Sequence, residues 1–324
     1  MTDPQSRPAT VAEFLEDWLQ SISYSVRPRT ARRYAEYVRL HALPSLGNLP
    51  LASLSPKDLQ ILYAGRMRSG LSAMSVLHLH RTLHRALGQA QRWGLIEVNP
   101  AALVDPPRPE RVEMHTLSPD EASRFLKTIR GDPLEALYTL AITTGMRQGE
   151  LLGLHWREVD LERSSIKVTG SLQYVPGQGL SVASPKTTRS RRNVLLSATA
   201  VDALRRHRLG QERERSARTK DWEDMDLVFT NAHGRPIYAS NLLKRSFTPL
   251  LEKAGLRHIR FHDLRHTAAT LLLGQRVHPK VVSEMLGHTN ISITLDLYSH
   301  ATPTMQREAA AAMDDLLGGS SNPE

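Results

Sequence analysis

Residues 260–298 constrain the fold of this chain more than any other stretch, because their apolar side chains repeat with the period of a helix. One apolar stripe falls at i, i+4, i+7 and i+8 and consists of Leu264, Ala268, Leu271 and Leu272. Pro279 is typical of a first helical position and Gly287 of the position just past a helix end, so a second helix is predicted between them. Asn290 can cap a third helix. The stretch therefore predicts a compact cluster of helices.

The predicted helical cluster carries four polar side chains that helices with a purely packing role do not require. They are His262, Arg265, His288 and Tyr298. The first two are three residues apart, which makes them neighbours on one helix surface. Each also has a purely structural explanation, as a core aromatic residue, a surface arginine over apolar neighbours, or a histidine at a helix start or in a turn. The residues alone leave both explanations open.

A metal site is a further alternative. His262 and His266 are four residues apart, and Asp263 follows the first of them, so HDLRH is a near match to the zinc-protease motif HExxH. That motif requires glutamate as a general base, and aspartate takes its place here. A zinc hydrolase is therefore kept only as a distant alternative.

The order and spacing of three short motifs resemble the tyrosine recombinase (phage integrase) family. These motifs are HDLR at 262–265, LGH at 286–288, and Tyr298 about ten residues later. Upstream, Arg147 and Glu150 in TGMRQGELLGL match the family's first arginine motif and its acidic position. The resemblance implies a mainly α fold with a small antiparallel β-sheet, in a two-domain DNA-breaking-rejoining arrangement.

The resemblance also implies a reaction. Breaking a phosphodiester requires neutralisation of charge on phosphorus, a nucleophile, and a proton for the leaving oxygen. The planar guanidinium groups of Arg147 and Arg265 suit the non-bridging oxygens of a phosphate. Tyr298 is expected to attack phosphorus and form a 3′-phosphotyrosyl bond. A phenol with a pKa near ~10 needs a base, for which His262 is the candidate.

Three further residues receive roles from the same resemblance. Lys186 matches a β-hairpin lysine of the family and is the expected acid for the leaving 5′-oxygen. His288 is expected to donate a hydrogen bond to the phosphate, and Glu150 to orient Arg147. Because the sequence contains neither a Walker loop nor an obvious carboxylate cluster for magnesium, no cofactor and no metal are predicted.

The composition favours a polyanionic partner. The 324 residues carry a formal net charge of +9 and give a pI of about 10.0, although a merely soluble basic surface would have the same charge. The chain contains no cysteine, so disulfides and thiolate metal sites are excluded. No apolar run approaches the ~18 residues of a membrane span, and the first ten residues lack a signal-peptide core. A soluble, cytoplasmic protein without a membrane partner is expected.

Two domains are predicted, because a segment rich in proline and charge interrupts the chain near residues 99–113. The expected divisions are a disordered lead-in at 1–10, a helical core-binding (SAM-like) domain at 11–100, a linker at 101–114, a catalytic domain at 115–300, and a C-terminal helix and tail at 301–324. The resemblance implies that the tail docks on a neighbouring protomer and that the two domains close around duplex DNA.

The first domain is predicted to be helical, with helices starting near Thr10 and Ser55 and a long helix over residues 72–93. Met74, Leu83 and Leu87 are among the residues of the long helix expected in the core. Candidate DNA contacts, which could also be a solvated basic face, are Arg32, Arg33, Ser75, His78 and Arg81.

The second domain is predicted to contain three short antiparallel strands at 165–169, 180–184 and 192–196. The last two strands are expected to form a hairpin whose basic tip contains Lys186, although a solvated turn would have the same composition.

The leading hypothesis is a site-specific DNA recombinase, an integrase of a phage or other mobile element. Its expected partner is double-stranded DNA, on which four copies assemble, whereas the free protein is monomeric or weakly associated. An accessory directionality factor is a possible partner in the family, and the short lead-in is expected to leave no room for an arm-binding domain. The alternatives are a catalytically inactive DNA-binding regulator and a type IB topoisomerase-like relaxing enzyme.

Overall fold

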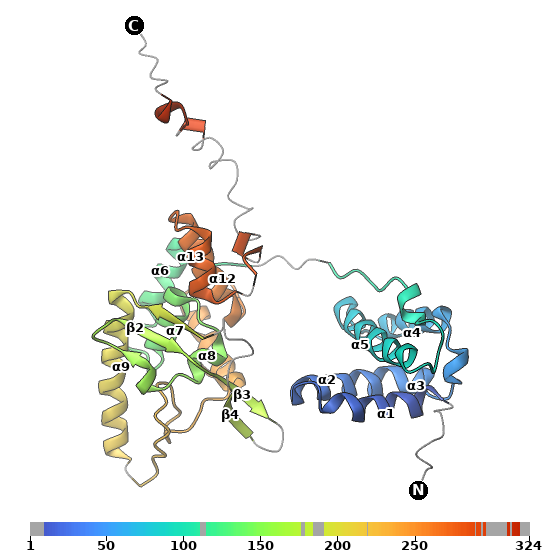
Figure 1. Cartoon of the computed structure of the whole chain (residues 1–324). Coiled ribbons are helices and arrows are strands. Elements are labelled where there is room, and N and C mark those ends of the chain that lie inside the picture. Colours follow the sequence, from blue (N-terminus) through green and yellow to red (C-terminus); the bar gives the residue numbers. More distant parts are fainter. Residues whose placement is uncertain are drawn as a thin grey trace. The chain divides into compact units, whose positions relative to one another are not determined.

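The computed structural model describes residues 10–110, 115–175, 179–183, 191–218, 220–288, 290–292, 294–295, 310–311 and 313–317. The chain divides into two compact units, Met1–Glu113 and Met114–Glu324, each with its own hydrophobic core (Figure 1). Within the described residues, no helix combines the length and the apolar character that crossing a bilayer requires.

The first unit is helical. Its elements are α1 (Val11–Ser23), α2 (Pro28–Tyr37), the π-helix η1 (Val38–Ala42), α3 (Leu43–Leu46), the 3-10 helix η2 (Leu51–Ser53), α4 (Pro56–Arg68), α5 (Ala73–Arg92) and the 3-10 helix η3 (Pro100–Leu103). The Thr10 side chain accepts a hydrogen bond from the N–H of Glu13, whose carboxylate accepts one from the N–H of Thr10. Ser55 and Asp58 form the same arrangement at α4, so both helices begin where the sequence predicts.

The long helix α5 packs against α1, α2 and α4. Its buried stripe consists of Val76, Leu79, His80, Thr82, Leu83, Ala86, Leu87 and Ala90. Leu83 and Leu87 are in the core as predicted, but the prediction for Met74 is wrong, because this side chain is 47% exposed. The buried stripe runs through Val76, Leu79 and Leu83 at i, i+3 and i+7, and Met74, two residues before Val76, lies on the opposite side of the helix.

The first unit extends further than its predicted boundary at residue 100. Ala101 and Val104 are buried in its core, and the Asn99 side chain holds η3 in place. The amide of Asn99 donates to the His84 carbonyl, and its oxygen accepts from the N–H of Ala101. The start of the predicted linker at residue 101 is therefore wrong, because its first apolar residues complete the helical core.

The second unit combines helices with two small sheets. Its helices are α6 (Pro119–Thr128), α7 (Glu135–Thr144), α8 (Gln148–Leu152), the 3-10 helix η4 (Trp156–Glu158), α9 (Ala198–Ala217), α10 (Ala239–Leu242), the π-helix η6 (Leu243–Phe247), α11 (Thr248–Lys253), α12 (Phe261–Gly274) and α13 (Pro279–Leu286). Almost every residue of α7 is buried, and α6, α8, α9 and α12 surround it. Four aromatic rings pack together at the centre: Phe125, Tyr138, Phe247 and Phe261.

The strands are antiparallel, but they pair differently from the prediction. β1 (Val159–Asp160), β2 (Ser165–Val168) and β5 (Arg192–Leu195) form one sheet in the order β1-β2-β5. β3 (Ser171–Val175) and β4 (Gly179–Ala183) form a separate hairpin. The predicted pairing of 180–184 with 192–196 is therefore wrong for the described residues. Alternation of side chains identifies a strand, but it does not determine which strand becomes its partner.

Candidate active site

Four of the six predicted catalytic residues meet in the second unit. Arg147 precedes α8, His262 and Arg265 lie in the first turns of α12, and His288 follows α13. Helix α12 packs against both α7 and α13, and α13 packs against β5, so these segments are neighbours in space (Figure 1). The other two, Lys186 and Tyr298, lie outside the described residues.

Gly145 brings two of these segments into close contact. It ends α7 in the left-handed conformation with φ 62°, which favours glycine. A Cβ atom at this position would lie 2.2 Å from Leu286 Cδ2 and 3.3 Å from Ala268 Cβ. The carbonyl of Gly145 accepts a hydrogen bond of 2.8 Å from Arg265 Nη1. The turn at Gly145 therefore positions Arg265 through a hydrogen bond, and two residues later the chain reaches Arg147 at the start of α8.

Arg147 is the N-cap residue of α8, and Glu150 holds it there. The Glu150 carboxylate accepts hydrogen bonds from the backbone N–H of Arg147 at 2.9 Å and from its Nη1 at 2.8 Å. The second terminal nitrogen, Nη2, donates to the carbonyl of Gly287 at 3.1 Å. The Glu150 side chain is 6% exposed and that of Arg147 is 38% exposed. Glu150 and the Gly287 carbonyl thus hold the guanidinium group of Arg147, and part of this side chain remains exposed to solvent.

Asp263, in the first turn of α12, fixes the start of this helix through its hydrogen bonds with Arg260. Asp263 is buried, and its carboxylate accepts hydrogen bonds from the backbone N–H, Nε and Nη2 of Arg260. The rings of His262 and His266 meet edge to face, with centroids 4.9 Å apart. Because Arg260 occupies Asp263, the carboxylate that the zinc-hydrolase alternative would need as a base is unavailable. Among the described residues, no group of three potential ligands could hold a metal ion.

Arg265 is buried far more deeply than an ordinary surface arginine, with an exposed fraction of 3%. Its Nη1 has the Gly145 carbonyl as an acceptor, whereas its Nη2 is buried and has no hydrogen-bond partner among the described residues. A buried guanidinium donor left unpaired is costly, so a partner that supplies an acceptor is expected. The structural explanation of Arg265 as a snorkelling side chain does not fit this burial.

His288 follows the left-handed Gly287 that terminates α13, as the sequence predicts. Its Nδ1 lies 2.8 Å from the hydroxyl oxygen of Thr294, a fully buried residue. The contact fixes the orientation of the imidazole ring. Thr294 had no distinguishing signal in the sequence, because its role depends on the turn that brings it back to the histidine.

Both imidazoles of the site are neutral near pH 7. Burial, the neighbouring His266 and the Arg265 guanidinium lower the pKa of His262 to about 4. Burial together with Arg265 and Arg147 lowers the pKa of His288 to about 4. His262 remains open to solvent on one side, which screens part of the effect.

The charge of Arg265 is retained despite its surroundings. Burial and the adjacent Arg147 lower the pKa of Arg265 to about 9, so its guanidinium group is still protonated at neutral pH. Glu150 offsets part of the charge of Arg147, and two mutually repelling cations beside two neutral imidazoles form a site that favours binding of a further anion.

Residues 115–305 match the phage integrase family, and residues 10–65 match the N-terminal SAM-like domain of phage integrases. The chain belongs to the phage integrase family.

Several proteins similar to this phage integrase family member are recombinases. A XerC-like tyrosine recombinase of Caldanaerobacter subterraneus subsp. tengcongensis is 32% identical over 95% of this chain and 83% of the relative. The ICEBs1 integrase of Bacillus subtilis is 26% identical over 97% of this chain and 85% of its own length. The chain is therefore a tyrosine-type site-specific DNA recombinase.

Solved structures share its fold. The Tn1549 transposon integrase in complex with a circular intermediate DNA has a TM-score of 0.81 at 23% identity, covering 94% of this chain and all of that one. A lambda integrase tetramer bound to a Holliday junction has a TM-score of 0.63 at 18% identity, covering 91% and 78%. These similarities bear out the predicted two-domain, mainly α fold with a small antiparallel sheet.

One buried residue of this phage integrase site was missed by the sequence analysis. Arg192, the first residue of β5, is 7% exposed and donates two hydrogen bonds to Glu150. A signal was present, because side chains two apart on a strand share a face and Val194 is an obvious core residue. The basic composition around Arg192 favoured a solvated interpretation instead.

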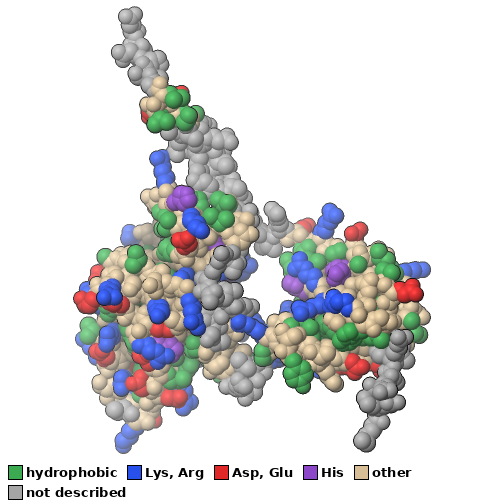
Figure 2. Space-filling model, in the orientation of Figure 1, with side chains coloured by type: hydrophobic (Ala, Val, Ile, Leu, Met, Phe, Trp, Pro, Cys, Tyr) green, Lys and Arg blue, Asp and Glu red, His purple; other side chains and the backbone are tan. Residues whose placement is uncertain are grey.

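The predicted DNA contacts of the first unit lie on α2 and α5. Arg32, Arg33, His78 and Arg81 are exposed, and Ser75 is half-buried. Arg32 forms an ion pair with Glu36 at 3.1 Å, and the Arg33 guanidinium lies over the Tyr37 ring at 5.0 Å. Figure 2 shows basic side chains and histidines close together on the visible face of this unit.

Proposed function

We propose that this phage integrase cleaves and rejoins double-stranded DNA through a 3′-phosphotyrosyl bond to Tyr298. One observation carries the proposal: the guanidinium groups of Arg147 and Arg265 flank one turn, and a buried nitrogen of Arg265 lacks an acceptor within the described part of the chain. A phosphodiester oxygen supplies that acceptor and offsets both positive charges. The roles of Tyr298 and Lys186 rest on their positions in the sequence motifs.

The cleavage step uses each group once. The phenolic oxygen of Tyr298 attacks phosphorus while His262 accepts its proton, which the neutral imidazole is able to do. The bond from phosphorus to the 5′-oxygen breaks, and Lys186 protonates the departing oxygen. Rejoining is the reverse: the 5′-hydroxyl of another strand attacks the phosphotyrosine and releases Tyr298. The covalent bond conserves the phosphodiester energy, so ATP is not required.

His288 is proposed to stabilise the phosphate through its second nitrogen. If Nδ1 accepts a hydrogen bond from the hydroxyl of Thr294, the neutral ring has its proton on Nε2. That nitrogen is then a donor for a non-bridging oxygen. Glu150 is proposed to orient Arg147, because it binds both the backbone and the side chain of that residue.

We further propose that the exposed basic residues of α2 and α5 contact the DNA backbone. The net charge of +9 supplies the long-range attraction, and the arginine and histidine side chains supply the local contacts. The tyrosine under Arg33 limits the number of rotamers that this side chain can adopt.

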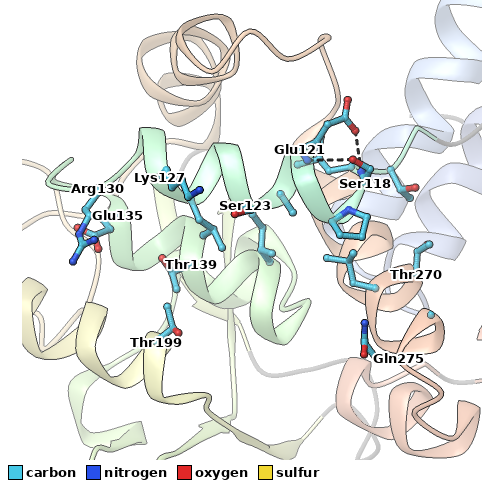
Figure 3. A pocket seen from close by; sticks show the side chains of 18 of the residues that line it. Ser118, Glu121, Ser123, Lys127, Arg130, Glu135, Thr139, Thr199, Thr270 and Gln275 are labelled. Atoms are coloured by element: carbon cyan, nitrogen blue, oxygen red, sulfur yellow. Dashed lines mark hydrogen bonds between the residues drawn. The ribbon is translucent and has the colours of Figure 1, made fainter.

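Assembly on DNA is proposed to use the C-terminal segment, with the free protein monomeric or weakly associated. Met313, Leu316 and Leu317 are exposed, and Asp314 and Asp315 give the segment negative charge. A cavity of about 980 Å³ lies between α6, α7, α9 and the end of α12 in the second unit (Figure 3). Lys127 on α6 and Arg130 just after this helix line it together with apolar residues such as Leu126 and Leu271, and the acidic lining residues are Glu121, Glu135 and Asp202. This combination suits the tail of a second copy.

The decisive experiment uses nicked DNA that contains the recombination site, identified from the DNA flanking the gene. Cleavage at the nick lets the short product diffuse away, so the covalent protein–DNA species accumulates and migrates more slowly in a denaturing gel. Tyr298→Phe is expected to abolish this species, whereas the control Tyr24→Phe, at a 95% exposed tyrosine, leaves it unchanged. A covalent species formed equally by Tyr298→Phe would show that another residue is the nucleophile.

The same assay tests the alternatives. An inactive regulator binds the site but forms no covalent species. A relaxing enzyme removes supercoils without joining two duplexes. A zinc hydrolase loses its activity in chelator, whereas strand cleavage by the proposed mechanism does not. An accessory directionality factor would be needed only if one of the two reaction directions fails with purified protein alone.

A further inference from the structure

The ion network behind the site extends beyond the residues that were assigned roles. Glu150 is bound from two sides, by Arg147 and by Arg192. Arg192 presents two nitrogens to the two carboxylate oxygens, at 3.2 Å and 2.9 Å, as in a bidentate arginine–carboxylate pair. Its Nε donates to the carbonyl of Met285 in the last turn of α13, at 2.7 Å. Arg192 therefore links β5, α8 and α13.

These contacts close a ring around the site. From Met285 the ring runs through Arg192 and Glu150 to Arg147, whose Nη2 returns to the carbonyl of Gly287. Gly287 also lies against Arg192, since a Cβ built on it would approach the Arg192 side chain to 3.1 Å. His288 is the next residue. The ring thus fixes both a cationic group and the turn that presents an imidazole.

Arg192 also determines how Arg147 distributes its donors. Burial opposes ionisation of Glu150, but hydrogen bonds from Arg192 and the charges of both arginines outweigh it and lower the pKa of the carboxyl. Because Arg192 satisfies one side of the carboxylate, Arg147 needs only Nη1 there. A guanidinium group has five N–H donors, and the two contacts described use two of them. The remaining donors can face a phosphate.

We propose that Arg192 is a positioning residue for strand cleavage, acting on Arg147 through Glu150 and on His288 through the end of α13. This inference rests on the proposed function of Arg147 and His288.

The test compares Arg192→Gln, Arg192→Lys and a matched control, Arg235→Gln, which removes an exposed arginine from its ion pair with Glu223. The rate of the first strand cleavage is measured in a single turnover at saturating DNA, together with DNA affinity. Arg192→Gln is expected to lower the rate by about 10–100-fold, the effect typical of residues that orient others in a site. DNA affinity is expected to change by less than about threefold, and the control to cleave at the normal rate.

Arg192→Lys separates the contribution of the planar guanidinium geometry of Arg192 from that of its positive charge. A lysine keeps the positive charge but cannot bind two carboxylate oxygens and a carbonyl at once, so an intermediate rate is expected. If Arg192→Gln does not fold, the double variant Glu150→Gln/Arg192→Gln removes the buried carboxylate, which would otherwise keep Arg147 as its only ionic partner, and provides a folded protein for the same measurement. That variant is expected to remain slow, because Arg147 is still unsupported.

A double-mutant cycle separates positioning from a general structural role. If Arg192 acts largely through Arg147, then Arg192→Gln costs distinctly less in an Arg147→Lys background than in the native chain. Equal losses in both backgrounds, or native rates for both Arg192 variants, would overturn the inference. If instead Arg147→Lys itself cleaves at the native rate, or Tyr298→Phe still forms the covalent species, the proposed function is wrong. Either result is distinguishable from a failure of the inference about Arg192, which concerns only the Arg192 variants.

Discussion

At the scale of single residues, the main feature of the site is the repulsion between the guanidinium groups of Arg147 and Arg265. Arg265 is almost fully buried, its pKa is lowered by burial and by Arg147, and one of its nitrogens has no acceptor in the described residues. Such an arrangement costs stability in the empty protein. Natural proteins tolerate this cost where the same groups bind a ligand, and a phosphate reverses the sign of the interaction. This unfavourable electrostatic arrangement therefore supports the proposal that the two arginines bind a phosphate.

The proposed role of His262 predicts a pH dependence of cleavage. In the proposed mechanism its neutral form is the base, and its pKa is lowered to about 4, so the active form predominates above that value and is lost as the pH falls through it. The groups facing it are His266, Arg265, Asp263 and Arg147. A bound phosphate anion raises the pKa, which places the expected midpoint between about 4 and the usual value of ~6.5.

Single-turnover cleavage rates measured from pH 4.5 to 8 test this expectation. The rate should change little between pH 7 and 8 on account of this group and decline on the acid side. His262→Gln should be slow and should lose the acidic decline. A midpoint above pH 7, or an unchanged acidic decline in the variant, contradicts the assignment of His262 as the base.

At the scale of elements, the site depends on how closely the α7–α8 turn approaches α12 and α13. Gly145 is the point of contact, since its carbonyl binds Arg265 and no side chain fits between it and Leu286. Helix α7 is buried on nearly every side and cannot shift without disturbing the core. The candidate catalytic groups therefore lie on packed helices or next to their ends.

Gly145→Ala is expected to lower the free energy of unfolding by about 2–4 kcal/mol, through the left-handed backbone and the collision with Leu286. The matched control is Gly131→Ala, at a glycine with φ 81° whose added Cβ would meet nothing within 4 Å. It should lose only the backbone contribution of about 1–2 kcal/mol. Urea unfolding of both variants measures the difference, and equal losses would mean that the contact with α13 is unimportant. Leu286→Ala should partly reverse the steric effect in Gly145→Ala.

At the scale of the whole molecule, two units with separate cores present different sets of side chains. The first unit presents an exposed basic surface on α2 and α5, and the second contains the converging arginines and histidines. In this chain, the exposed apolar residues of the C-terminal segment and the cavity beside α6 are the features expected to connect copies.

Leu316→Asp/Leu317→Asp tests that connection. The double variant is expected to bind a single half-site with unchanged affinity but to form at least tenfold fewer tetrameric complexes on full sites, because two apolar anchors become charged. Analytical ultracentrifugation of the DNA complexes measures both properties. Leu209→Asp, on the exposed face of α9, is the matched control. Native assembly by the double variant would exclude the tail as the connecting segment, and loss in a variant with Leu126→Asp alone would support the cavity as its receptor.

Local signals predicted much of the fold. The capping pairs at Thr10 and Ser55 mark helix starts that the structure has, and Gly287 ends α13 in the predicted left-handed turn. The errors lie where a choice depends on distant residues. The partner of β5 is β2 rather than β4, and Ala101 and Val104 return to the first core instead of starting the linker. Neither choice has a signal within a few residues along the chain.

The sequence by itself determined which side chains are available for chemistry, because the identity and spacing of Arg147, His262, Arg265 and His288 are visible in short motifs. Only the tertiary structure decided how these groups are held. The burial of Arg265, the contact of His288 with Thr294, and the ring through Arg192 all join residues from separate elements. Hydrogen bonds and pKa values depend on distances in space, and those distances arise only when the helices and strands pack together.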